Sequence, residues 1–122
     1  MGKNILIVDD SVLTQKQLSM IMQNSGHKVV DIAKNGVEAV SKFSEKSQEI
    51  DIVLLDITMP LLDGIDVLKK ILQIKPGLPV IMVSALGRED TVRECLALGA
   101  RSFIIKPFNV EKITETVNYV AG

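Results

Sequence analysis

The chain has 122 residues, of which 47% are hydrophobic and 24% are charged, and its formal net charge is −1. This is the size and composition of one globular domain, and the balanced charge argues against a basic surface for nucleic acid. The sequence has no apolar run of the roughly 18 residues that a membrane helix needs, and its start does not resemble a signal peptide. With Cys95 as the single cysteine, an internal disulfide is excluded. We expect one cytoplasmic domain over residues 1–122 that binds neither nucleic acid nor membrane.

The first half of the chain begins with a predicted strand over residues 4–9 and a helix over residues 11–25, which Gly26 ends. The inward positions of this helix are predicted to be Leu13, Leu18, Ile21 and Met22. A strand over residues 28–33 follows, and its low apolar content suits an edge of a sheet. Asn35 and Gly36 then turn into a helix over residues 37–46, whose inward side is predicted to carry Val37, Val40 and either Phe43 or Ser44.

The second half continues the alternation with a predicted strand over residues 51–56. Asp63 and Gly64 open the next helix, with Ile65, Leu68, Ile71 and Leu72 inward. A strand over residues 80–84, a helix over residues 88–98 and a strand over residues 102–106 come next. Asn109 is a favourable N-cap for the last helix, over residues 110–120, with Ile113, Val117 and Val120 inward.

Strands that alternate with helices in this way predict right-handed crossovers and a parallel sheet. The fold class is therefore α/β, a doubly wound five-stranded parallel sheet in the order 2-1-3-4-5 flanked by five helices. In this order the first and third strands are neighbours, and the direction of winding changes between them. Ligands in such sheets bind at this switch point, beyond the carboxyl ends of the strands.

Four of the predicted strands end on polar residues. Asp9 and Asp10 follow the first strand, Asp56 ends the third, Ser84 ends the fourth and Lys106 ends the fifth. Three carboxylates at one rim repel one another unless a cation lies among them, and hard oxygen ligands favour Mg²⁺. Each aspartate alone would suit a helix cap or a turn, but the whole set at one switch point predicts a Mg²⁺-dependent site that handles phosphate.

The segments ILIVDDS (5–11), DIVLLDITMP (51–60) with the following DG (63–64), VIMVSA (80–85) and IIKPF (104–108) occur in an order and at spacings that are highly specific. Together they span essentially the whole chain. On these motifs the chain resembles the receiver domain of a two-component response regulator, and its length and layout are similar to those of stand-alone chemotaxis receivers.

The resemblance implies that Asp56 accepts a phosphoryl group from a histidine kinase or a phosphotransfer protein. It assigns the Mg²⁺ ligands to Asp9, Asp10, Asp56 and the backbone carbonyl of Thr58. It further implies that Ser84 and Lys106 stabilise the phosphoryl group, and that the Lys106–Pro107 peptide is cis. Such a protein is not an enzyme in the usual sense, because it catalyses only its own phosphorylation and dephosphorylation.

The resemblance also implies a switch and an output surface. Phosphorylation would bias Phe103 inward, and partners would read a face made by the fourth helix, the fifth strand and the fifth helix. Residues expected on this face are Glu89, Val92, Leu96, Phe103 and Thr116. The expected molecule is a monomeric regulator, with chemotaxis as the favoured pathway and a phosphorelay intermediate as the alternative.

Several other residues are predicted to have no role in the site. His27 is predicted to be a surface turn residue, Cys95 a small core residue, and Met20, Met22, Met59 and Met82 packing residues. The competing class, a phosphatase of the haloacid-dehalogenase type, needs a second aspartate two positions after the first. Ser11 occupies that position here, and the chain lacks room for a cap domain. A flavodoxin-like cofactor binder would need a loop rich in Ser, Thr and Gly where the acidic pair stands.

Overall fold

The computed structural model describes residues 2–122 and contains ten regular elements in strict alternation. The strands are β1 (Asn4–Val8), β2 (Lys28–Ala33), β3 (Ile52–Leu55), β4 (Val80–Ser84) and β5 (Ser102–Ile105). The helices are α1 (Val12–Asn24), α2 (Gly36–Lys46), α3 (Gly64–Ile74), α4 (Glu89–Leu98) and α5 (Val110–Ala121). Among the described residues, no helix is long and apolar enough to cross a membrane.

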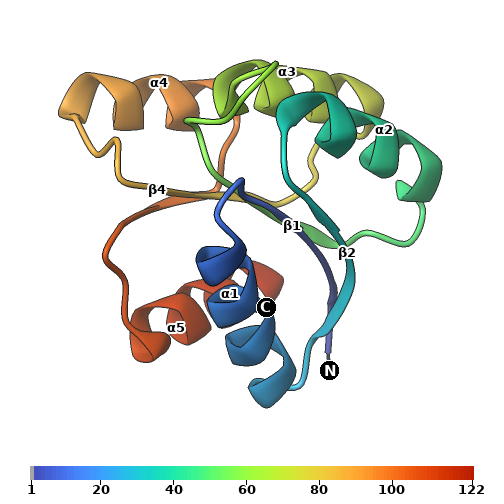
Figure 1. Ribbon diagram of the computed structural model, residues 1–122, viewed down its shortest axis with the longest axis vertical. Helices are drawn as coiled ribbons and strands as arrows, with labels where there is room; N and C mark the ends of the chain where they lie inside the picture. Colours follow the sequence, from blue (N-terminus) through green and yellow to red (C-terminus); the bar gives the residue numbers. More distant parts are fainter. Residues whose placement is uncertain (1) are drawn as a thin grey trace.

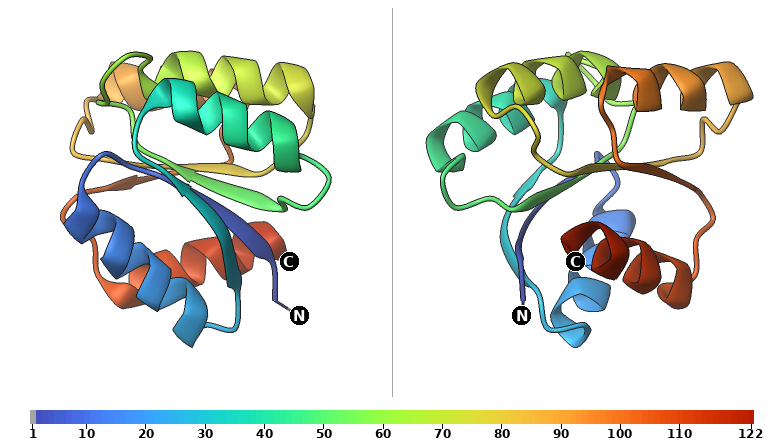
Figure 2. Two further views of the ribbon diagram at one scale, coloured as in Figure 1. Left: turned by 45° about the vertical axis from the view of Figure 1, so that its right-hand side comes forward. Right: turned by 180° about the vertical axis from the view of Figure 1, so that it is seen from behind.

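All five strands are parallel and lie in the order β2-β1-β3-β4-β5, so the predicted fold class is confirmed. Helices α2, α3 and α4 cover one face of the sheet, and α1 and α5 cover the other (Figure 1). Figure 2 shows the same three layers from two further sides. The central strands β1, β3 and β4 are buried on both faces, which is why they read as continuous apolar runs in the sequence.

Local signals in the sequence determine where the helices begin. The side chains of Ser11, Asn35, Asp63 and Asn109 each accept a hydrogen bond from a backbone N–H in the first turn of the helix that follows. At the other end of α4, Gly99 adopts a left-handed φ of 117°, which glycine reaches without steric cost. These caps explain why the predicted bounds agree with the observed ones to within one or two residues.

Three residues predicted to be packed are exposed instead. Leu13 of α1, Met20 of α1 and Val37 of α2 are 67%, 64% and 56% exposed, so these predictions are wrong. In α1 the buried stripe passes through Thr14, Leu18, Ile21 and Met22, one position away from Leu13. In α2 the small residues Gly36 and Ala39 are buried. At Gly36 the helix lies so close to the backbone of Leu62 that a larger side chain would not fit. Hydrophobicity alone does not report such a preference for small side chains.

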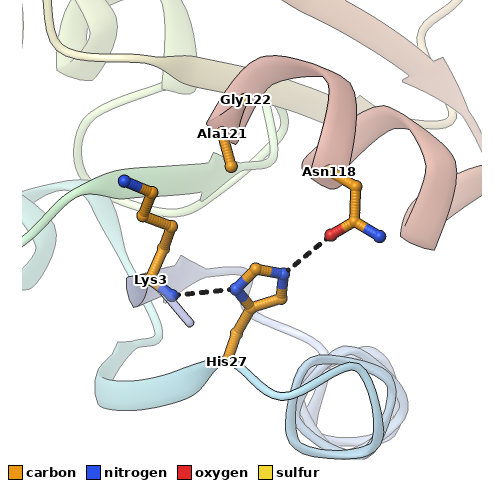
Figure 3. A pocket seen from close by; sticks show the side chains of 5 residues that line it. All are labelled: Lys3, His27, Asn118, Ala121 and Gly122. Carbon is orange, nitrogen blue, oxygen red and sulfur yellow. Dashed lines mark hydrogen bonds between the residues drawn. The ribbon is translucent and has the colours of Figure 1, made fainter. Parts of the chain in front are cut away.

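The prediction for His27 is also wrong, because its side chain is only 7% exposed. The backbone N–H of Lys3 donates to Nδ1 at 3.0 Å, and Nε2 lies 3.0 Å from Oδ1 of Asn118 (Figure 3). Since Nδ1 accepts a hydrogen bond, the neutral ring carries its proton on Nε2 and donates it to Asn118. His27 therefore joins the start of β1 to α5, through partners that are distant in the sequence. Cys95, in contrast, is fully buried as predicted.

The edge strand β2 is attached to α2 by an ion network. Asp31 accepts from Lys46 Nζ at 2.9 Å and pairs with Lys42 Nζ at 3.2 Å, and Lys42 also pairs with Glu38. Partial burial opposes ionisation of Asp31, but the hydrogen bonds from Lys46, Ile32 and Lys42 prevail and lower its pKa below the ordinary 3.8. The charged form of Asp31 is therefore favoured in the folded state.

From this network we expect Asp31→Asn to lower the free energy of unfolding at neutral pH by about 1 kcal/mol. A carboxylate whose pKa is lowered by folding stabilises the protein above its unfolded pKa, and that contribution disappears as the pH falls through the folded pKa. The difference between variant and wild type should therefore begin to decrease as the pH falls below about 3.8, and it should vanish below the lowered pKa that Asp31 has in the folded state. Urea unfolding at neutral and acidic pH measures it, with Glu45→Gln, an exposed carboxylate of α2, as the control. A difference that persists unchanged in acid would contradict the assignment to Asp31.

Candidate functional site

The residues of the site lie at the carboxyl ends of four neighbouring strands. Asp9, Asp56 and Lys106 are each the first residue after a strand, and Ser84 is the last residue of β4. Backbone hydrogen bonds continue past the strand ends: Asp56 N–H donates to Val8 O at 2.9 Å, and Lys106 N–H donates to Ser84 O at 2.9 Å. The sheet therefore fixes the starting point of each of these side chains.

The three aspartates converge as the sequence predicts. Asp9, Asp10 and Asp56 each offer a carboxylate oxygen, and these oxygens lie within 4.8 Å of one another. Asp9 and Asp56 are 1% and 5% exposed, whereas Asp10 is exposed to solvent. Two buried carboxylates beside an open third one fit a hard divalent cation that keeps some of its water. The donor set is thus suited to Mg²⁺.

Lys106 bridges the two buried carboxylates. Its Nζ lies 2.9 Å from Asp9 Oδ2 and 3.4 Å from Asp56 Oδ2, and its side chain is 21% exposed. Burial by itself disfavours the ammonium, but the hydrogen bond to Asp9 and the attraction of Asp56 and Asp9 raise the pKa of Lys106. The lysine therefore stays charged and offsets part of the negative charge at the rim.

The backbone also holds the Asp56 carboxylate. Its Oδ1 accepts the backbone N–H of Ile57 at 2.7 Å, which leaves Oδ2 on the side of Lys106. Burial raises the pKa of Asp56, and the charge of Asp9 adds to this, while Lys106 opposes it. A cation bound among the aspartates would favour the ionised carboxylate, which is the nucleophilic form.

The other two predicted residues of the rim are Ser84, at the end of β4, and Thr58, in a loop. Ser84 is 1% exposed, and its Oγ accepts the backbone N–H of Leu86 at 3.1 Å. Thr58 is exposed in the loop between β3 and α3. Its carbonyl remains a predicted ligand. The predicted cis peptide between Lys106 and Pro107 is confirmed.

Of the predicted output residues, Val92 and Leu96 lie on α4 and Phe103 lies on the edge strand β5, which contacts α4. Phe103 and Val92 are half-buried, and Leu96 is 44% exposed. Phe103 packs against the core beneath α2, α3 and α4. Ile105 is not among the residues predicted for this face. It is 51% exposed and approaches Gly87 so closely that a Cβ on Gly87 would lie 2.6 Å from Ile105 Cδ1. The two-residue period of the strand, which puts Ile105 on the same side as Phe103, was the available signal.

Comparisons with known proteins agree with this geometry. The model of the response regulator receiver domain family matches residues 5–118. The chain is 42% identical to the chemotaxis protein CheY of Thermotoga maritima over 121 residues, which are 99% of each protein. It is also 42% identical to CheY of Treponema pallidum, over 93% of this chain and 78% of that protein.

Solved structures give the same result. The CheX-CheY-BeF3-Mg²⁺ complex from Borrelia burgdorferi contains a chain that is 47% identical, with a TM-score of 0.95, over 97% of this chain and 88% of the other. The fold, the motif order and the similarity over nearly the whole length lead to one conclusion: the chain belongs to the response regulator receiver domain family.

Proposed function

We propose that this protein is a single-domain response regulator that accepts a phosphoryl group at Asp56 in a Mg²⁺-dependent reaction. The observation that carries the proposal is the convergence of Asp9, Asp10 and Asp56 beside Lys106 at one rim of the sheet. The donor is a phosphohistidine of a sensor kinase or of a phosphotransfer protein. Support for an external donor comes from His27, the single histidine, which lies buried against Lys3 and Asn118.

In the proposed reaction an oxygen of the Asp56 carboxylate attacks the phosphorus atom of the phosphohistidine. A phosphorus–oxygen bond forms, the phosphorus–nitrogen bond breaks, and its electron pair remains on the imidazole of the donor. The product is an acyl phosphate on Asp56. Such transfers depend on positioning and on charge stabilisation rather than on a separate acid or base.

The chain's own residues can provide both the positioning and the charge stabilisation. The Ile57 N–H holds one carboxylate oxygen at 2.7 Å, so that Asp56 keeps a fixed orientation. Lys106 offers positive charge next to the attacking carboxylate of Asp56, and the Ser84 hydroxyl is placed at the end of a neighbouring strand. Asp9, Asp10, Asp56 and the Thr58 carbonyl would hold Mg²⁺, and when bound the ion supplies positive charge to the phosphoryl oxygens.

The direct test is incubation of the purified protein with a radiolabelled phosphohistidine protein or a small phosphodonor, with Mg²⁺ or with EDTA. We expect labelling in Mg²⁺ and loss of labelling after the metal is removed, because the buried carboxylates otherwise repel the incoming phosphate. Mass spectrometry of peptides reduced at the acyl phosphate locates the label. Labelling that is equally fast in EDTA would refute the metal dependence.

The lifetime of the phosphorylated form gives a further prediction. Leu86 lies two residues beyond Ser84, is 40% exposed, and has no polar group with which to orient a water molecule. We expect Leu86→Glu to accelerate self-dephosphorylation by about tenfold, because a carboxylate can bind the attacking water. The decay of the label after removal of the donor measures this rate, with Leu86→Met as the apolar control. Decay that is equal in Leu86→Glu and wild type would contradict the role of Leu86.

For the output we propose the face formed by α4, β5 and α5, with Val92, Leu96 and Phe103 among its residues, and chemotaxis as the pathway. The similarity to CheY of Thermotoga maritima over 99% of both proteins supports this choice. Affinity capture with and without beryllofluoride and Mg²⁺ tests it. A motor-switch protein captured only with beryllofluoride supports chemotaxis, whereas a phosphotransfer protein would show a phosphorelay intermediate instead. Size-exclusion chromatography under both conditions tests the proposed monomer.

We further propose that the chain does not turn over phosphate esters. An assay with p-nitrophenyl phosphate as substrate distinguishes a receiver domain from a phosphatase of the haloacid-dehalogenase type. We expect no appreciable turnover, because Ser11 stands where that class needs its second aspartate, and it caps α1 instead. Multiple turnover that Asp9→Asn removes would favour the phosphatase.

A further inference from the structure

Two glycines at the starts of neighbouring helices touch the loop that follows Asp56. Gly36 is the first residue of α2 and Gly64 is the first residue of α3, and both are buried. A Cβ on Gly36 would lie 1.9 Å from the carbonyl oxygen of Leu62, and a Cβ on Gly64 would lie 2.0 Å from the carbonyl oxygen of Asp56. Real Cβ atoms essentially never approach other atoms within 3.0 Å, so neither position has room for a side chain.

These contacts connect α2 with the phosphorylation site through backbone atoms. Helices α2 and α3 lie side by side on one face of the sheet (Figure 2). The N–H of Gly64 donates to Ile57 O at 2.7 Å, and the N–H of Ile57 donates to Asp56 Oδ1, also at 2.7 Å. A displacement of the loop at Leu62 therefore reaches the Asp56 carboxylate within two hydrogen bonds.

If a side chain were added at Gly36, we expect the loop after Asp56 to be displaced rather than helix α2. Helix α2 is anchored by Ala39 and Phe43, which are fully buried. Thr58, Pro60 and Leu61 of the loop are open to solvent, and Leu61 is 78% exposed with a φ of 73°. A non-glycine residue in the left-handed region is costly and persists only where its surroundings hold it. A methyl group on Gly36 would lie 1.9 Å from the Leu62 carbonyl oxygen, so that oxygen would have to move away by about 1.5 Å or more to reach the 3.4 Å of an ordinary contact.

We infer that Gly36 is a positioning residue for the phosphorylation site: its missing side chain lets α2 pack on the backbone at Leu62 and so holds the Asp56 carboxylate and the Thr58 carbonyl in place for Mg²⁺. This inference rests on the proposed function, because it concerns the same metal site. It assigns a role in that site to a residue of a helix that contributes no side chain to the rim.

The test compares Gly36→Ala with Phe43→Leu, which disturbs α2 two turns away from the loop. The NMR shifts of the Ile57 and Gly64 amides during a Mg²⁺ titration report the affinity for the metal. Hydrogen exchange of the Gly64 amide is measured in the metal-free protein. Urea unfolding gives the stability of each variant. We expect Gly36→Ala to weaken Mg²⁺ binding by about tenfold, since misplacements of this size disrupt sites strongly, and to speed exchange at Gly64. Phe43→Leu should lose stability but keep the affinity for Mg²⁺.

A second variant keeps the test decisive if Gly36→Ala does not fold. In Gly36→Ala with Leu61→Gly, glycine accepts the positive φ and lets the loop move aside, so we expect a folded protein with weakened Mg²⁺ binding relative to Leu61→Gly alone. Wild-type affinity and wild-type exchange at Gly64 in the folded Gly36 variant would overturn the inference and leave the proposed function intact. A wild-type protein that shows no response to Mg²⁺ would overturn the proposed function itself.

Discussion

Asp56→Asn is expected to abolish phosphorylation completely. The amide that replaces the Asp56 carboxylate has no anionic oxygen to attack phosphorus. Intact-mass measurement after incubation with a small phosphodonor and Mg²⁺ detects the added phosphoryl group. We expect the wild type to be labelled and the variant to remain at its unmodified mass.

The matched control for this substitution is Asp66→Asn, an exposed aspartate in the first turn of α3. It removes the same charge outside the acidic cluster and should leave labelling at the wild-type rate. Full labelling of Asp56→Asn at another residue would show that a different group is the acceptor. In that case the acidic cluster would be a metal site without a phosphoacceptor.

The second large effect is expected from Lys106→Gln. This substitution leaves Asp9 and Asp56 buried side by side without their cation, which we expect to lower the free energy of unfolding in EDTA by about 2 kcal/mol. The loss is smaller than for a fully buried pair, because the Lys106 side chain is 21% exposed. Mg²⁺ should restore more stability to the variant than it adds to the wild type, since the metal no longer competes with the ammonium for Asp9.

Urea unfolding in EDTA and in saturating Mg²⁺ measures both parts of this prediction. Lys70→Gln, a substitution on the exposed side of α3, is the control and should change neither value. An equal gain from Mg²⁺ in Lys106→Gln and wild type would contradict the competition between metal and lysine. If Lys106→Gln had the wild-type free energy of unfolding in EDTA, this would contradict the stabilising role of Lys106 between the buried Asp9 and Asp56.

The sequence motifs predicted the residues of the site more completely than the hydrophobic pattern predicted the residues of the core. Asp9, Asp56, Ser84 and Lys106 could be placed from the sequence alone, because strand ends are marked by the change from apolar to polar residues. The order of the strands follows from the alternation of elements and the handedness of the crossovers. Once that order is known, these side chains must meet at one edge.

Packing at close range was decided only by the tertiary structure. Leu13 and Val37 are apolar yet exposed. Gly36 faces inward at the start of α2, because a Cβ there would lie 1.9 Å from the carbonyl oxygen of Leu62. His27 is buried because its two partners, Lys3 and Asn118, come from segments that are distant in the sequence.

The sequence by itself therefore determined the fold class, the family and the chemistry of the rim. These depend on local patterns that each strand carries within itself. The tertiary structure alone decided which helix positions face inward, how the histidine is satisfied and how α2 supports the loop after Asp56. These depend on distances between atoms of separate segments, and no periodicity along one segment records such distances.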